Sequence, residues 1–113
     1  MAELVILTPA QREMEEIALL HLSLSGPQSA RRITDLIYRT LERLEQFPLS
    51  GHPPRDRWLA REGYRLVIAG KYIAVYRYFE AENRVCIYHV SHGSRNYPTA
   101  FKRMTEESGG NTP

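Results

Sequence analysis

The stretch from Gly63 to Tyr97 limits the possible folds most, because it contains three short segments of β type joined by two tight turns. The segments are rich in Tyr, Val and Ile, which favour strands, and they cover Tyr64–Ile68, Tyr72–Phe79 and Arg84–Val90. Gly70 and Asn83 stand in the two connections, where turn residues are expected. Strands joined by such short turns pair antiparallel, so the stretch predicts a three-stranded meander.

The middle segment has two different faces, because successive side chains in a strand point to opposite sides. One face carries Ile73, Val75, Arg77 and Phe79, and the other carries Tyr72, Ala74, Tyr76 and Tyr78. Both faces are largely apolar. We expect one of them to pack on helices, and the tyrosine face, whose hydroxyl groups can contact water, to stay partly open.

The residues before the meander begin with a short strand and a helix. Glu3–Leu7 is β-branched and aliphatic, and it ends at Thr8, a candidate helix cap. Pro9 suits the first helical position, and Gln11 can complete a capping box. The helix is predicted to extend to about Ser23, with an apolar stripe that consists of Ala10, Met14, Ile17, His21 and Leu24.

A second helix follows the turn at Ser25–Gln28 and ends at Pro48, so the two helices form an antiparallel hairpin. Its apolar stripe consists of Ala30, Ile33, Ile37, Leu41, Leu44 and Phe47. Leu36, Tyr38 and Thr40 widen that stripe. The added surface is either further core, which we favour, or a groove for a partner helix.

Residues 48–62 predict a loop, because three prolines, a glycine and alternating charges leave no periodicity. Trp58 and Leu59 are expected to pin this loop to the body of the protein. The reason is that burial of a large aromatic side chain is strongly favourable.

Length and composition fit a single globular domain. The 113 residues are 42% hydrophobic and 25% charged, which is ordinary for such proteins. We expect one domain over residues 1–105, with a short helix within 98–107, and a flexible tail over residues 106–113. No apolar run approaches a membrane span, and the acidic Glu3 does not suit a signal peptide, so a cytoplasmic protein is expected. The single cysteine, Cys86, excludes an internal disulfide.

Charge is unevenly distributed along the chain, although the net charge is only +2. Residues 1–47 contain five Lys and Arg against seven Asp and Glu, whereas residues 55–103 contain ten against four. The first part therefore carries −2 and the second +6. The basic part predicts an anionic or acidic partner, and the alternative is that its arginines only solvate the sheet.

Polar side chains near the end of the last predicted strand are the strongest candidates for chemistry. They are His89, His92, Arg95 and Tyr97, with Arg65 and Arg77 on the neighbouring strands. Transfer of an RNA phosphodiester needs a base, an acid and cations, which these residue types can supply. A purely structural role for the same side chains is equally compatible with the sequence.

Other chemistries find less support. His52, Cys86, His89 and His92 match no zinc spacing, and strand alternation places Cys86 and His89 on opposite faces, so no metal and no cofactor are expected. Ser91 and Ser94 lack the sequence of a nucleophile elbow. His21 lies on an apolar helix stripe and is expected to be half-buried and hydrogen-bonded.

The predicted order of elements, together with four segments, resembles the RelE/ParE superfamily of toxins from bacterial type II toxin-antitoxin modules. The resemblance covers about residues 3–98, and the segments are Leu7–Ala10, Leu44–Pro48 with Gly51–Pro53, Gly70–Arg77 and Val90–Arg95. It implies an α+β fold of the order β-α-α-β-β-β. In this fold a two-helix hairpin packs on a mainly antiparallel four-stranded sheet.

The superfamily contains ribosome-dependent mRNA endonucleases of the RelE type and DNA gyrase poisons of the ParE type. RelE-like enzymes hold the scissile phosphate with Lys and Arg residues. Arg65 keeps one of these cations, but Val67 and Ile73 stand where two others are expected. The G-K-Y-x-x-x-Y-R pattern at Gly70–Arg77 and the ending His92–Arg95 resemble the ParE branch more closely.

The resemblance implies a toxin of the plasmid-stabilisation type that inhibits DNA gyrase by binding and causes growth arrest. The alternative is an mRNA endonuclease that acts on the ribosome. The expected target-binding residues are Arg65, Lys71, Arg77, His92, Arg95 and Tyr97, and a nuclease would use Arg65, His92, Arg95 and Tyr97.

The resemblance also implies a cognate antitoxin. This partner would lay a helix on the hairpin Thr8–Phe47 and an extended segment near the basic sheet. No membrane, cofactor or small-molecule substrate is implied.

Overall fold

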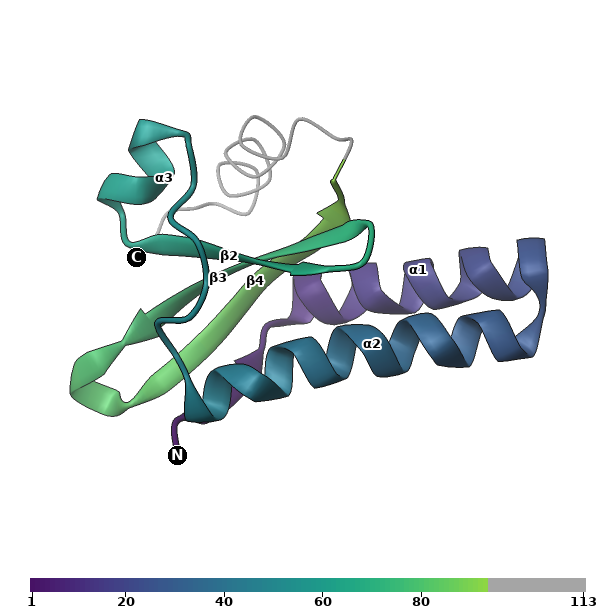
Figure 1. Ribbon diagram of the computed structural model, residues 1–113, viewed down its shortest axis with the longest axis horizontal. Coiled ribbons are helices and arrows are strands. Elements are labelled where there is room, and N and C mark those ends of the chain that lie inside the picture. The colour runs from purple at the N-terminus through teal and green to yellow at the C-terminus, as the bar shows by residue number, and fades with distance from the viewer. Residues whose placement is uncertain (94–113) are drawn as a thin grey trace.

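The structure is a computed structural model that describes residues 1–93. Its elements in chain order are β1 (Glu3–Ile6), α1 (Thr8–Ser25), α2 (Pro27–Gln46), α3 (Arg57–Arg61), β2 (Tyr64–Ala69), β3 (Tyr72–Phe79), a 3-10 turn (Glu80–Glu82) and β4 (Arg84–His92). Figure 1 shows the long hairpin of α1 and α2 beside the sheet. The predicted α+β fold is confirmed, with α3 as an addition. The expected helix within 98–107 and the tail 106–113 lie outside the described residues.

The four strands form one sheet in the order β1-β4-β3-β2. β2, β3 and β4 pair antiparallel as the predicted meander, and β1 joins β4 in parallel. β1 and β2 are therefore the two edge strands. The parallel pair is possible because the whole helical hairpin lies between β1 and the later strands in the sequence.

A β-bulge interrupts the pairing of β3 with β4. Val75 pairs with His89, but the next residue, Tyr76, pairs with Ile87, so Tyr88 is one extra residue on β4. Cys86 pairs with Arg77, which lies on the same face of β3 as Val75. The prediction that Cys86 and His89 point to opposite faces is therefore wrong, because the extra residue shifts the alternation between them.

The main core lies between the hairpin and the sheet. α1 contributes Ala10, Met14 and Ile17, α2 contributes Ile37, Leu41 and Leu44, and β3 contributes Tyr72, Ala74 and Tyr76. The tyrosine face of β3 is thus the face that packs on the helices, and the prediction that it stays partly open is wrong. Its hydroxyl groups need no water, since the Tyr76 hydroxyl donates to the carbonyl of Pro48 at 2.8 Å and accepts from the amide of Gly51 at 3.0 Å.

A smaller core covers part of the opposite face of the sheet. Leu59 of α3 is fully buried there against Tyr64 and Val75. The Asp56 side chain accepts a hydrogen bond from the Leu59 amide at 3.0 Å and so begins the helix. The loop predicted for residues 48–62 therefore contains a short helix, and Leu59 pins it as expected. Trp58 stays 37% exposed and stacks on Tyr64 at 6.3 Å between ring centroids.

The ends of the hairpin differ from the predicted ones. Leu7, not Thr8, is the N-cap of α1, and the Gln11 side chain donates to the carbonyl of Ile6 at 2.6 Å. Leu24 and Phe47 were predicted to be buried but are 74% and 56% exposed. The hairpin extends beyond the end of the sheet (Figure 1), so the last turn of α1 does not pack on the sheet. Phe47 is the C-cap of α2, where the chain turns away from the helix.

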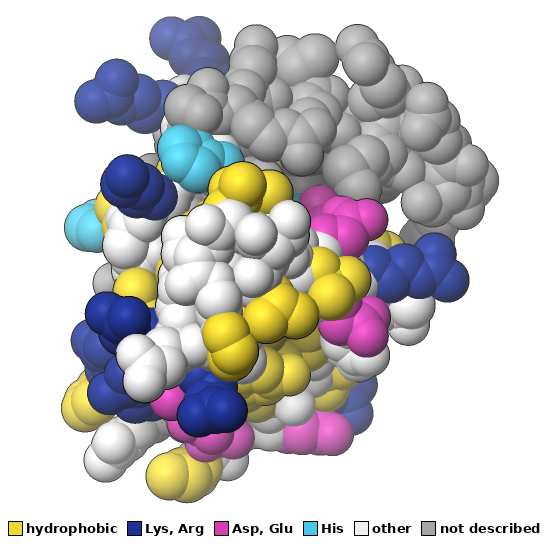
Figure 2. All heavy atoms as spheres, turned by 90° about the vertical axis from the view of Figure 1, so that its right-hand side faces the viewer, with side chains coloured by type: hydrophobic (Ala, Val, Ile, Leu, Met, Phe, Trp, Pro, Cys, Tyr) yellow, Lys and Arg dark blue, Asp and Glu magenta, His cyan; other side chains and the backbone are white. Residues whose placement is uncertain are grey.

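Apolar side chains gather around the free end of the hairpin. Figure 2 looks onto this end and shows hydrophobic side chains around it. The exposed leucines of α1 are Leu19, Leu20, Leu22 and Leu24. No helix within residues 1–93 is long and apolar enough to cross a membrane.

We predict that Tyr76→Phe lowers the free energy of unfolding by about 1–3 kcal/mol, because the Gly51 amide and the Pro48 carbonyl lose their partner in a buried place. Tyr78→Phe is the matched control, since the Tyr78 hydroxyl bonds the exposed Asn83 side chain and its removal should cost less than about 0.5 kcal/mol. Urea denaturation at neutral pH measures both changes. If both variants lost the same free energy of unfolding, the Tyr76 hydroxyl would not stabilise the fold through its bonds to Pro48 and Gly51.

Candidate functional site

Two of the predicted target-binding residues, Lys71 and His92, lie together at one end of the sheet. Lys71 is exposed in the turn between β2 and β3, and its carbonyl accepts a hydrogen bond from the Gly93 amide at 2.7 Å. The next residue, Tyr72, pairs with His92 on the neighbouring strand, and their rings pack edge to face with 5.5 Å between the ring centroids. The end of β4 therefore lies beside the Lys71 turn, and His92 with it.

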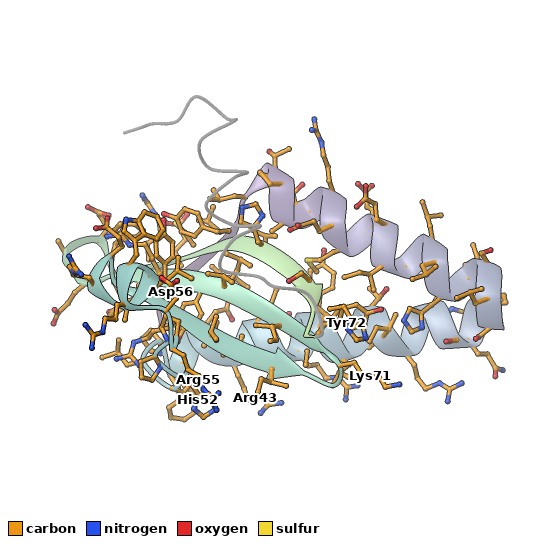
Figure 3. The ribbon with its side chains drawn as sticks, turned by 90° about the horizontal axis from the view of Figure 1, so that it is seen from above. Arg43, His52, Arg55, Asp56, Lys71 and Tyr72 are labelled. Atoms are coloured by element: carbon orange, nitrogen blue, oxygen red, sulfur yellow. The ribbon has the colours of Figure 1, made fainter. Side chains whose placement is uncertain are left out.

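Tyr72 ties this end of the sheet to the hairpin. The Tyr72 hydroxyl lies 3.0 Å from Nε2 of His21, and Nδ1 of His21 lies 3.2 Å from the Ser29 hydroxyl. His21 is half-buried and hydrogen-bonded on both ring nitrogens, as predicted. Figure 3 shows Lys71 and Tyr72 as neighbours at the tip of the β2–β3 hairpin. The place where Lys71 and His92 meet is thus held by contacts from α1, α2 and β3.

Arg65 has a structural position. Its Nη1 donates to the carbonyl of Gly51 at 2.8 Å and to the carbonyl of Leu49 at 3.2 Å. A hydrogen bond from a charged donor is stronger than one from a neutral donor, so the two bonds hold the guanidinium against the loop after α2. This cation therefore fixes the loop that follows the hairpin.

Arg77 lies away from Lys71 and His92. It is five residues after Tyr72 on β3, which corresponds to about 17 Å along a strand. Its guanidinium carbon lies over the ring of Phe79 at 4.7 Å and over the ring of Tyr64 at 5.3 Å. Its place is on the face of the sheet that α3 partly covers, where it supports a layer of aromatic side chains.

Burial raises the pKa of three tyrosine hydroxyls above 10.0. They belong to Tyr64 and Tyr88, which pack edge to face at 5.1 Å beside Arg77, and to Tyr76 in the main core. The positive charge of Arg77 lowers the pKa of Tyr64 and Tyr88 and offsets part of the effect of burial. All three hydroxyls are therefore neutral near pH 7 and act as hydrogen-bonding groups rather than bases.

His89, the other histidine of β4, is buried at the junction with α1. Its Nδ1 lies 3.2 Å from the Glu13 carboxylate, which also accepts the amide of Val90 at 2.8 Å. Glu13 thus continues the hydrogen bonding of β4 past the end of β1. Within residues 1–93, no three His, Cys, Asp or Glu side chains lie close enough together to hold a metal ion.

The six predicted target-binding residues are consequently not one cluster within the described part of the chain. Lys71 and His92 lie together, Arg65 is held by the loop after α2, and Arg77 lies on the aromatic face. Arg95 and Tyr97 lie outside the described residues. The sequence grouped these residues by strand ends, but only pairing register decides which ends meet.

A groove between the end of α2 and β2 is a surface that the sequence did not predict. Its lining includes Arg43, Phe47, Gly51, His52, Val67 and Ile68, and we call it the edge groove. Figure 3 shows Arg43 and His52 near each other, with Lys71 further along the same border. Arg39 and Arg43 are four residues apart and exposed on α2, which is the one sequence signal that could have indicated a basic helix face.

Comparison with known proteins agrees with this fold. The sequence matches the family described as ParE toxin of type II toxin-antitoxin system, parDE, over residues 4–97. The chain belongs to this ParE toxin family. No curated protein sequence matches it. The fold and the family together make this protein a toxin of a type II toxin-antitoxin system, as the resemblance implied.

Three solved toxin structures have folds similar to that of this ParE-family chain. The chromosomal ParDE system from P. aeruginosa has a TM-score of 0.68 at 19% identity, over 81% of this chain and 96% of that one. The RelBE2 complex from Mycobacterium tuberculosis has a TM-score of 0.60 at 25% identity, over 80% and 96%. The isolated E. coli RelE toxin has a TM-score of 0.58 at 15% identity, over 92% and 99%. The RelE/ParE fold is thus confirmed, and it is shared by both branches.

We predict that Arg65→Ala lowers the free energy of unfolding by about 1.5–3 kcal/mol, because two carbonyls of the loop after α2 lose a charged donor. Lys71→Ala is the matched control: its side chain is exposed, and the loss should stay within about 0.5 kcal/mol. Thermal and urea unfolding measure both. An unchanged Arg65→Ala variant would show that these hydrogen bonds do not stabilise the fold.

We also predict that the free energy of unfolding falls as the pH rises from about 10. Tyrosines of the unfolded chain have pKa values near 10, whereas burial raises the pKa of Tyr64, Tyr76 and Tyr88 in the folded chain. The unfolded chain therefore loses these protons first, which favours unfolding. Below about pH 10 the three tyrosines are protonated in both states, and their contribution to the free energy of unfolding is fully present. Urea denaturation between about pH 8 and pH 11 gives the slope. Tyr88→Phe should make the slope shallower, and a flat profile for the unmodified protein would contradict the prediction.

Proposed function

We propose that this toxin arrests growth by binding DNA gyrase and not by cutting messenger RNA. Membership of the ParE family supports the proposal, since the gyrase poisons of the superfamily form the ParE branch. The observation that carries it is the position of Arg65. This residue is the one cation that the chain keeps from the RelE pattern on β2, and its Nη1 is engaged by the carbonyls of Leu49 and Gly51.

The positions of the other candidate groups support the same conclusion. Cleavage of RNA requires a base, an acid and cations that converge on one phosphate. His89 is tied to Glu13 at the junction of β4 with α1, and Arg77 lies about 17 Å along the strand from the Lys71 turn. A binding toxin needs no such convergence, because exposed charged and apolar surface is enough to hold a macromolecule.

One observation favours the mRNA endonuclease as a second candidate. Lys71 and His92 lie together at an exposed end of the sheet, where a histidine could exchange a proton and a lysine could hold a phosphate. Arg95 and Tyr97 follow closely in the sequence. The endonuclease function would therefore use the same end of the sheet as gyrase binding. The two functions differ in their target and in whether a bond is cut.

A cognate antitoxin is the second partner of the proposal, and the hairpin offers it a place to bind. A groove opens between α1 and α2, and its lining includes Ile6, Met14, Ala18, Thr34 and Tyr38. Tyr38, which the sequence left between core and groove, is 43% exposed. Together with the exposed leucines of α1, this groove fits an amphipathic helix of the antitoxin. A module of this kind would act in the cytoplasm and stabilise the plasmid or locus that encodes it.

The proposal predicts that the purified protein inhibits DNA supercoiling by gyrase and traps cleaved DNA with no ribosome present. Lys71→Ala should weaken inhibition about tenfold or more, because an exposed cation of the surface is lost. Arg61→Ala removes an exposed arginine of α3, which lies at the opposite end of β2 from Lys71, and should leave inhibition within about twofold. Relaxed plasmid and gyrase in a supercoiling assay provide the measurement.

Programmed ribosomes provide the contrasting assay. The proposal requires the message to remain intact at toxin concentrations that stop gyrase. The proposal would be wrong if a molar excess of toxin left supercoiling unaffected while the message was cut. If His92→Ala then abolished the cutting, the mRNA endonuclease would be the function.

A further inference from the structure

One flank of α2 carries a row of three arginines. Arg32, Arg39 and Arg43 are all exposed, and they follow one another at intervals of seven and four residues, which keeps them on one side of the helix. The row is about 16 Å long, because each helical residue adds about 1.5 Å. Leu36 belongs to the same row and packs against the main core. The contact of Leu36 with the core fixes the rotation of the helix, so the row has a rigid support.

The turn between β2 and β3 lies against this row. A Cβ atom added to Gly70 would lie 3.1 Å from Cδ2 of Leu36, so the turn packs on the middle of the row. Lys71 is the next residue of the turn, and its side chain is exposed. At the far end of the row, Arg43 and His52 both line the edge groove (Figure 3). We call the basic residues of this surface the basic stripe, which consists of Arg32, Arg39, Arg43, His52 and Lys71.

The acidic residues of α2 lie outside the basic stripe. Asp35 lines a hollow together with Leu22 of α1, so it lies on the side of α2 that faces α1. Glu42 and Glu45 are not part of the lining of the edge groove. Within residues 1–93 no carboxylate forms an ion pair with an arginine of the stripe. Nε of Arg39 donates to the backbone carbonyl of Asp35 at 3.3 Å, which orients the guanidinium without neutralising it.

We propose that the basic stripe binds the phosphate backbone of duplex DNA without reading the base sequence. Arginine and lysine are common donors to phosphate oxygens, and such contacts carry no sequence information. Duplex DNA is a stiff rod with closely spaced charges, so a straight row of cations on a rigid helix can contact several phosphates at once. This contact would hold the toxin on DNA whether or not gyrase is its target.

Duplex DNA fits the basic stripe better than a single strand does. Proteins that hold single strands stack successive bases on several aromatic side chains. Within residues 1–93 the aromatic side chain beside the stripe is Phe47 in the edge groove, whereas Tyr38 of α2 lines the groove between α1 and α2. The described part of the stripe therefore offers charge for a backbone but no series of rings for bases.

The test measures binding of the full chain to a fluorescently labelled duplex of about 20 base pairs by anisotropy. If the four Lys and Arg side chains of the stripe contact phosphates, the logarithm of the binding constant should fall against the logarithm of the salt concentration with a slope of about −3.6. Two duplexes of unrelated sequence should bind within about twofold of each other. The assay contains neither gyrase nor ribosomes, so its outcome is independent of the proposed function.

Matched variants locate the site. Arg39→Gln and Arg43→Gln should each weaken binding and make the salt slope shallower by about one, because each variant removes one phosphate contact. Arg12→Gln is the control, since Arg12 is exposed on α1, which packs mainly on β4, and its loss should leave the slope unchanged. Circular dichroism confirms that the three variants are folded.

Four results would overturn the proposal. The first is no binding of the duplex at about 50 mM salt, where phosphate contacts are strong. The second is an equal change of slope in Arg12→Gln. Tighter binding of either separated strand would replace duplex DNA by single-stranded nucleic acid. Displacement of the duplex by a lower concentration of polyglutamate, counted in charges, would replace it by an acidic protein.

Discussion

The hydroxyl group of Tyr76 connects the centre of the sheet to the loop that follows the helical hairpin, and much of the remaining geometry depends on this contact. Tyr76 is fully buried in β3, and its hydroxyl bonds the backbone of Pro48 and Gly51. Gly51 has to be a glycine there, since a Cβ atom would lie 2.5 Å from the same hydroxyl. The loop is therefore held close enough for His52 to pair with the edge of β2.

The arginines of the sheet serve the fold at least as much as any target. Arg65 bonds the carbonyls of the same loop, and Arg77 lies over the rings of Phe79 and Tyr64. Side chains that a nuclease would aim at a phosphate thus act as supports for backbone and aromatic groups. This arrangement is in keeping with the proposed action by binding, because a surface that only binds needs shape more than it needs convergent acids and bases.

Periodicity and turn residues predicted the main elements well, since those signals act over a few neighbouring residues. The meander, the hairpin and the stop at Pro48 all followed from them. α3 was missed because a helix of five residues has no period to detect, and its start depends on the Asp56 side chain and on the burial of Leu59. The bulge at Tyr88 was missed because it is a property of two paired strands and not of either strand alone.

The sequence by itself determined the order of the four strands and the two long helices, the existence of a basic second half and the family to which the chain belongs. Tertiary structure decided which face of β3 is buried, because the partners of the Tyr76 hydroxyl come from residues 25 and 28 positions earlier in the chain. It also decided which candidate residues lie together: Lys71 and His92 do, whereas Arg77 does not join them. The physical reason is that strand register and hydrogen bonds between distant segments are set only when the hairpin and the sheet pack together.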